Sequence, residues 1–404
     1  MATAAGRAGL SGAYLAAAIL FHSMPAGAQQ PLAAHLVPVS TGMCISRQLA
    51  SLDIGFTWTH EIVNTEVEDS CATQGKAQSL DGANNIVKHY DDPALRQRVQ
   101  SMLTKMAADG ATVVRTIVWF RHAEDAPMAK RTTDPLGLLV ATDGKLPAGE
   151  VNNIVSYVSD AQAAGYSRFV VVVGPQGTSN PKCRKGTEWG GCYDETLLAR
   201  SWSVVDQVAT ALHTPQLSKI DVVVDLSSEN CADPNSKMQN LRFLYGNVNA
   251  FTRYMVSHYR DKFGDHQFIA SCGTGSQERV LGELAAQVSL FRDLGVRPAS
   301  LDIHMYETDP EVLRNILLSA DATARRLGVP LDVLETYYDH ASLFKIVSDL
   351  MSANQLPSLR DLVVWPRKMT SECSMDVRAP YDMKGMDAEL GRRNSDGQSL
   401  QVCR

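Results

Sequence analysis

The chain has 404 residues, of which 45% are hydrophobic and 20% are charged, and its formal net charge is −6. This negative charge excludes the class of proteins that bind nucleic acid through a basic face. The length suits either two small domains or one barrel of about 250 residues with insertions. Because no linker, internal repeat or low-complexity segment divides the interior, we expect a single domain.

The N-terminus predicts an export signal. Arg7 precedes the apolar run 13–21, which is too short to span a bilayer, and the segment 26–28 (Ala-Gly-Ala) offers the small residues that signal peptidase requires. We therefore expect residues 1–28 to be removed and residues 29–404 to form a secreted or periplasmic domain. No later apolar run reaches the length of a membrane span.

Short β-branched runs alternate with amphipathic stretches from residue 52 onward, which indicates parallel strands covered by helices. The predicted strands are 52–58, 112–118, 169–173, 220–226, 267–271, 300–304, 330–335 and 361–365. Helices are expected at 93–108, 150–164, 194–212, 237–263, 276–295, 309–327 and 341–353, with 385–392 as the candidate for a final helix. This order predicts the α/β class and a (β/α)8 TIM barrel with long strand-to-helix loops.

The alternative fold is an open, doubly wound sheet. Such a sheet usually carries a Gly-rich phosphate-binding turn after its first strand. The first predicted strand here contains Ile54-Gly55-Phe56-Thr57, which is no such turn. The sequence therefore favours the closed barrel.

Eight cysteines remain after the expected cleavage. An even number in an exported chain predicts disulfides, because the compartments outside the cytoplasm are oxidising. Two cysteines bracket one short Gly-rich loop, and two others follow neighbouring predicted strands, so each of these two pairs is expected to bond. The expected pairs are Cys183 with Cys192 and Cys231 with Cys272, which leaves Cys44 with Cys71 and Cys373 with Cys403 by elimination.

Polar and aromatic side chains lie on or directly after several of the predicted strands. The active site of a (β/α)8 barrel is built at the C-terminal ends of its strands, so such residues are informative there. Each one alone is more often a solvated loop residue or a structural hydrogen-bonding partner, but together they occur on five strands. These residues are Arg115, Asp225, Ser228, Glu229, His304, Tyr306, Glu335 and Trp365.

Glycoside hydrolysis requires two carboxyl groups, one protonated to assist the leaving oxygen and one ionised to meet the developing positive charge. Glu229 follows the fourth strand and Glu335 ends the seventh, so the two face each other across the predicted barrel. A retaining enzyme places such a pair about 5 to 5.5 Å apart. Arg115 is expected to keep Glu335 ionised and Tyr306 to orient it, whereas His304, Ser228 and Trp365 are expected to bind substrate.

Five segments together resemble the motifs of clan A glycoside hydrolases. Segment 225–230 (Asp-Leu-Ser-Ser-Glu-Asn) resembles the strand-four motif, 304–306 (His-Met-Tyr) is similar to the strand-six motif, and 333–335 (Val-Leu-Glu) resembles the nucleophile segment. Segment 110–115 is similar to the residues that precede and include the clan's strand-two arginine. Segment 363–365 is similar to the segment that ends in its strand-eight tryptophan. The resemblance implies a retaining hydrolase that binds a carbohydrate, needs no cofactor, and uses Glu229 as acid/base and Glu335 as nucleophile.

Two residues depart from the clan pattern. Ser228 stands where the clan has Asn, and Asn230 stands where Pro is common. A hydroxyl reaches less far than an amide, so a barrel that binds polysaccharide with little or no cleavage is the second interpretation. A metal hydrolase is a third, but His60 and His304 are too few for a ligand cluster. Aromatic residues that would suit stacking on sugar rings are Trp58, Trp119, Tyr337, Tyr338 and Trp365.

Overall fold

The computed structural model describes ten segments of the chain. They are residues 44–60, 85–124, 138–175, 182–185, 188–226, 241–264, 266–271, 277–369, 377–394 and 396–403, and side chains are not described for 182–193, 241–250, 278 and 279. These segments belong to one compact unit, Met43–Arg404. The predicted export signal, residues 1–28, lies outside the described residues, so it stays a prediction.

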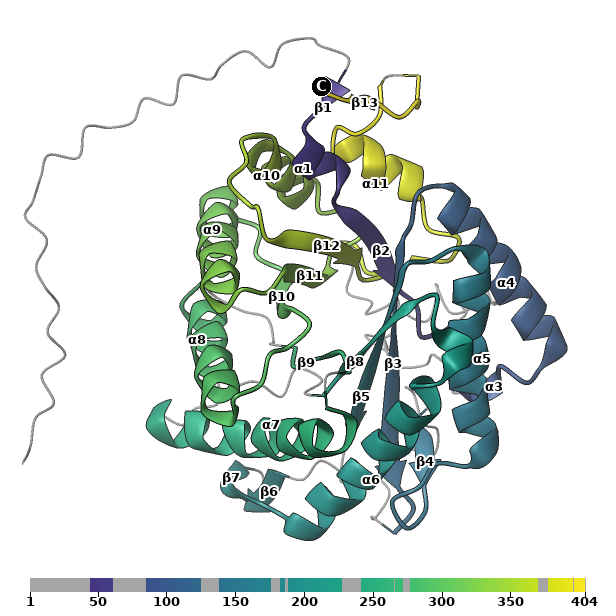
Figure 1. The fold of residues 1–404 in the computed structure, drawn as a ribbon, viewed down its shortest axis with the longest axis vertical. Coiled ribbons are helices and arrows are strands. Elements are labelled where there is room, and N and C mark those ends of the chain that lie inside the picture. Colours follow the sequence, from purple (N-terminus) through teal and green to yellow (C-terminus); the bar gives the residue numbers. More distant parts are fainter. Residues whose placement is uncertain are drawn as a thin grey trace, which may run out of the picture. The chain divides into compact units, whose positions relative to one another are not determined.

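Eight parallel strands form the barrel (Figure 1). In chain order they are β2 (Asp53–Thr57), β3 (Val113–His122), β5 (Arg168–Pro175), β8 (Asp221–Asp225), β9 (Phe268–Ile269), β10 (Leu301–Met305), β11 (Leu331–Thr336) and β12 (Leu359–Val364). Each strand from β2 to β9 pairs with the next, β10 to β12 do the same, and β12 pairs with β2. Between β9 and β10 the backbone N–H of Ala299 donates to the carbonyl of Phe268 at 2.8 Å. The barrel is therefore nearly closed, which confirms the predicted (β/α)8 fold.

Helices follow the strands and surround the barrel (Figure 1). They are α4 (Pro93–Ala108), α5 (Ala148–Ala164), α6 (Glu195–Leu212), α7 (Leu241–Phe263), α8 (Gln277–Leu294), α9 (Pro310–Leu327), α10 (Ala341–Ser352) and α11 (Met383–Glu389). Helix α9 shows why such boundaries can be read from sequence. The Asp309 side chain accepts from two backbone N–H groups at its start, Pro310 follows, and Gly328 ends it with φ +73°.

Several short elements add to this frame. They are β1 (Cys44–Ile45), α1 (Arg47–Ala50), α3 (Ile86–His89), β4 (Leu139–Ala141), β6 (Lys182–Lys185), β7 (Glu188–Tyr193), the 3-10 helix Pro215–Leu217 and β13 (Gln401–Val402). Strand β4 extends the sheet beside β3, and β6 and β7 form an antiparallel hairpin. These elements are too short to produce a hydrophobic period, so the sequence did not predict them.

Side chains fill the barrel interior. A layer with one side chain from each of six strands consists of Val113, Val170, Val223, Ile269, Leu334 and Val363. On β2 the interior position is Gly55, where a Cβ atom would lie 2.2 Å from the carbonyl oxygen of Val113. The two strands therefore approach each other too closely at this point for any larger residue.

Charged side chains close the N-terminal end of the barrel. The Arg168 guanidinium donates to both carboxylate oxygens of Asp361, at 2.5 and 2.6 Å, and to Asp221 at 3.0 Å. Arg360 donates to Asp332 at 3.1 and 2.6 Å. Asp361 has no solvent exposure, so its charge depends on the arginines for compensation. This end of the barrel serves stability, whereas the chemistry of the fold is found at the opposite end.

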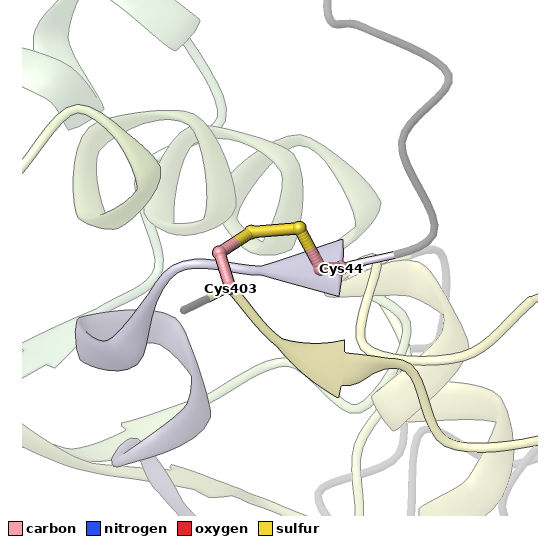
Figure 2. Close-up of a disulfide and its surroundings, with 2 residues drawn as sticks. All are labelled: Cys44 and Cys403. Carbon is pink, nitrogen blue, oxygen red and sulfur yellow. A yellow bond between two sulfur atoms is a disulfide. The ribbon is translucent and has the colours of Figure 1, made fainter.

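A disulfide joins the two ends of the described unit. Strand β1 pairs in parallel with β13, and Cys44 bonds to Cys403 with a Cα–Cα distance of 5.0 Å (Figure 2). The pairing of Cys44 with Cys71 and of Cys373 with Cys403 was therefore wrong. It was the pairing left by elimination, whereas closure of the barrel brings together residues that are 359 positions apart.

The other expected disulfides stay predictions. Cys231 and Cys272 lie outside the described residues, and the side chains of Cys183 and Cys192 are not described either. The backbone places the last two on the neighbouring strands β6 and β7.

Removal of the Cys44–Cys403 bond by the double substitution Cys44→Ser and Cys403→Ser should lower the free energy of unfolding by about 2 to 4 kcal/mol. The bond restricts the unfolded chain over almost its whole length, and long closed loops gain the most from such a restriction. Urea unfolding followed by circular dichroism measures the change, with Val402→Ser, an exposed neighbour, as the control. Equal unfolding midpoints for the double variant and the wild type would show that the disulfide contributes nothing to stability.

Candidate active site

Glu335 lies near the C-terminal end of β11, where the strand pairing with β10 is irregular. Ile303 pairs with Val333, but the next pair is His304 with Glu335, so β11 holds one extra residue, Leu334. Successive residues of a regular strand face opposite sides. The extra residue changes this pattern, and both Leu334 and Glu335 face the interior. Irregularities of this kind re-aim side chains beside functional sites.

Three side chains hold the carboxylate of Glu335. The Tyr306 hydroxyl donates to Oε1 at 2.6 Å, and Nη1 of Arg115 donates to Oε2 at 3.0 Å. Nδ1 of His304 lies 3.3 Å from the same Oε2. The Arg115 and His304 side chains are buried, and that of Glu335 is 11% exposed. An ionised carboxylate here is therefore paired with a buried guanidinium and has a fixed orientation.

A second set of groups lies next to these partners. Nη1 of Arg115 also donates to the Thr57 hydroxyl at 3.4 Å. Nε2 of His304 lies 3.2 Å from Oδ2 of Asp302, whose Oδ1 accepts the backbone N–H of Leu334 at 3.1 Å. Burial raises the pKa of Asp302 to about 6, although His304 and Arg115 act in the opposite direction. These neighbouring groups are supplied by β2 and β10.

Asp302 and Thr57 were not among the site residues predicted from the sequence. The alternation of side chains along a strand could have indicated Asp302, because it lies two residues before His304 and therefore faces the same side. By the same rule Thr57 faces the same side of β2 as Gly55, the residue two positions before it. Thr57 ends β2 and Asp302 lies inside β10, but neither belongs to one of the five motif segments from which the site was predicted.

Apolar and aromatic side chains lie beside the carboxylate. Trp365, which follows β12, forms a cluster with Ile117 and Val172, and Trp119 and Tyr306 pack against it. Trp365 is 7% exposed, whereas Trp119 and Tyr306 are half-buried. Aromatic faces next to a carboxylate suit the apolar CH face of a sugar ring.

Two more of the expected aromatic residues have different positions. The ring of Tyr337 packs edge-on against Tyr306, with centroids 4.7 Å apart, and the Arg367 guanidinium lies 5.9 Å from the Tyr337 ring. Trp58 is 1% exposed and packs against Phe56 on the outer side of β2, under the helices. The expectation that Trp58 stacks on a sugar is therefore wrong, because strand alternation turns it away from the barrel interior.

The structure brings together most of the predicted site residues. Arg115, His304 and Tyr306 contact Glu335 directly, and Trp365 packs with Tyr306. Ser228 and Glu229 lie outside the described residues. The strand that precedes them, β8, ends at the fully buried Asp225, whose carboxylate accepts the backbone N–H of Ser271 at 3.0 Å.

Within the part of the chain that the structure describes, no three His, Cys, Asp or Glu side chains are arranged to hold a metal ion. None of the described helices combines the length and the apolar character that crossing a bilayer requires.

The fold and the buried carboxylate define a class: (β/α)8 barrels with an acidic site at the C-terminal ends of their strands. No family model and no curated protein matches the sequence. Solved structures do match the fold, and those described next are glycoside hydrolases.

A trimodular endoglucanase of the GH5_4 subfamily has a TM-score of 0.50 and 10% identity, and the match covers 85% of this chain and 60% of the endoglucanase. A family 5 xyloglucanase from Paenibacillus pabuli has a TM-score of 0.49 and 13% identity, with coverage of 85% and 98%. An endo-1,4-beta-mannanase from Eisenia fetida has a TM-score of 0.48 and 13% identity, with coverage of 85% and 92%. At these identities the similarity concerns the fold, and the site must carry any statement about function.

Proposed function

We propose that the protein is a secreted, retaining glycoside hydrolase of clan A that acts on an oligo- or polysaccharide. Glu335 is the nucleophile and Glu229 the acid/base. The observation that carries the proposal is the Glu335 carboxylate, which Arg115, Tyr306 and His304 hold at the catalytic end of the barrel. A carboxylate that is ionised, oriented and partly screened from water is what nucleophilic attack on a sugar requires.

The proposed reaction has two steps. Glu335 attacks the anomeric carbon, the bond to the leaving oxygen breaks, and Glu229 gives its proton to that oxygen. Glu229 then removes a proton from water, the water oxygen attacks the anomeric carbon, and the ester to Glu335 breaks. This route needs the two carboxyl groups about 5 to 5.5 Å apart, which is part of the proposal.

The contacts of Glu335 suit this chemistry. Arg115 compensates the charge of the free carboxylate, and the Tyr306 hydroxyl holds Oε1 at 2.6 Å until the carboxylate forms an ester. Trp365 packs beside Tyr306, where its ring can contact the apolar face of the bound sugar. Ser228, in the place of the clan's Asn, would donate to the sugar through a shorter side chain.

Ser228 also supports the second candidate function, a barrel that binds polysaccharide without cleaving it. Both functions use the same aromatic and polar side chains. They differ only in turnover, so product formation decides between them.

Proton NMR of the first sugar released tests the proposal. The mature protein is incubated with a panel of polysaccharides that includes bacterial exopolysaccharides, and we expect the first anomer to have the configuration of the bond that was cleaved. Glu311→Gln, at an exposed position on α9, serves as the control for handling and folding. An inverted first anomer would reject a nucleophilic Glu335, and binding without release of any product would favour the binding protein.

A further inference from the structure

Strand β3 is longer than the other barrel strands, and it extends past the site. Its pairing with β5 is regular from Val113 to Phe120, and residues 120–122 then pair with β4. Because side chains of a regular strand alternate between two faces, every second residue of β3 faces the barrel interior and the site. From the interior outward, these residues are Val113, Arg115, Ile117, Trp119 and Arg121. The strip therefore leads from the contact with Glu335 to the outer end of the strand.

The two faces at the outer end of β3 have different surroundings. Phe120 belongs to the core under the helices, and its ring packs edge-on against the buried His122, with centroids 5.4 Å apart. On the opposite face, Trp119 packs against the cluster that contains Trp365. Trp119 and Arg121 are both half-buried. Arg121, two residues after Trp119, thus lies on the face that carries the site.

The neighbours of Trp119 and Arg121 are small or apolar. The partner of Trp119 on β5 is Gly174, which has no side chain, and the partner of Arg121 on β4 is Val140. Within the segments that the structure describes, no carboxylate forms an ion pair with Arg121. A guanidinium stays charged at every pH that proteins tolerate. Arg121 therefore offers a permanent positive charge and several N–H donors to an anion that lies along the strip.

We propose that Trp119 and Arg121 form a subsite for an acidic sugar, so that the substrate is a polysaccharide that carries carboxylates. The inference rests on the proposed function for the cleavage step at Glu335. The apolar face of the sugar packs on Trp119, and the guanidinium, about 7 Å further along the strand, donates two hydrogen bonds to the sugar carboxylate. Arg121 lies about 20 Å beyond Arg115 along the strand. The acidic sugar is thus not the one that is cleaved but one further along the chain, where Glu335 does not repel it.

The charge of the whole chain makes such a preference informative. The formal net charge is −6, so the protein as a whole repels polyanions. Non-specific attraction therefore does not favour an acidic polysaccharide over a neutral one. A preference for carboxylates must come from a local cation, and removal of that cation must abolish it.

Carboxyl-reduced polysaccharides isolate the contribution of the charge. Carbodiimide activation and borohydride reduction convert each uronic acid into the neutral hexose and leave the linkages unchanged. Affinity electrophoresis measures binding to alginate, polygalacturonate and hyaluronan in the native and the reduced form, and every protein carries Glu335→Gln so that no cleavage intervenes. We expect at least one native polysaccharide to bind about tenfold or more tightly than its reduced form. This preference should shrink as the salt concentration rises.

Two variants separate the roles of the two side chains. Arg121→Gln should bind the native and the reduced form equally, because the guanidinium is lost. Trp119→Ala should weaken both forms by the same factor, about tenfold, because stacking does not depend on the carboxylate. Arg314→Gln makes the same change as Arg121→Gln at an exposed position of α9 and should keep the preference. If no native polysaccharide is preferred, or if Arg121→Gln retains the preference, the inference is overturned.

Binding and turnover fail separately. If Arg121→Gln abolishes the preference for the acidic form and no glycan is cleaved, the proposed hydrolase fails while the acidic subsite stands. If products form and Arg121→Gln changes kcat/KM equally for native and reduced polysaccharides, the hydrolase stands and the acidic subsite is rejected.

Discussion

Glu335→Gln should lower kcat by about three orders of magnitude or more, with little change in affinity for the glycan. The amide has nearly the same shape and keeps one oxygen for its donors, but it cannot form the glycosyl ester. Turnover of the polysaccharide identified by NMR gives kcat, and calorimetry with the same polysaccharide gives the affinity.

Glu311→Gln provides the matched control, because it makes the same chemical change at an exposed position of α9. Its kcat should equal that of the wild type. A Glu335→Gln protein that retains a tenth of the wild-type kcat would remove this residue from the nucleophile role. Loss of both binding and folding stability would indicate that the contact with Arg115 is mainly structural.

Glu229→Gln should produce the second large effect, and the size of the effect should depend on the leaving group. We expect kcat/KM to fall by about 10² to 10⁴ for natural glycans, whose leaving oxygen needs a proton. Activated aryl glycosides need none, so their kcat/KM should change little. A plot of log kcat/KM against the pKa of the leaving phenol measures this dependence.

The slope of that plot distinguishes the roles of the two glutamates. It should become steeper in Glu229→Gln than in the wild type, because the substrate alone must then carry the negative charge that develops. An equal loss of kcat/KM for aryl glycosides and for natural glycans would contradict the acid role of Glu229.

The fold could be predicted from hydrophobic patterns because the barrel strands are buried on both faces. Strands such as β5 are continuous runs of valine, and the intervening helices have an apolar face. Helix α4 begins and ends where the sequence predicted, since Asp92 and Pro93 begin it and Gly110 follows its end. The disulfide between Cys44 and Cys403 could not be found in this way, because it depends on how the closed barrel brings β1 to β13.

The site was only partly predictable, because some of its contacts depend on the folded strands and leave no pattern in the sequence. Arg115 and Glu335 are 220 residues apart, yet the rule that active sites lie at strand ends placed them together. The extra residue in β11, which turns Glu335 inward beside Leu334, leaves no mark in the hydrophobic pattern. The contact between Asp302 and His304 was not predicted, because Asp302 lies inside β10 and outside the motif segments.

Trapping of the covalent intermediate tests the central claim most directly. A 2-deoxy-2-fluoro glycosyl fluoride of the sugar that the protein releases slows both steps, because fluorine destabilises the positive charge of the transition state, whereas the good leaving group still permits attack. We expect the mass of the intact protein to rise by one fluoro-sugar, and peptide mass spectrometry to place that sugar on Glu335. A sugar attached to a different carboxylate, or continued hydrolysis without any adduct, would contradict the account.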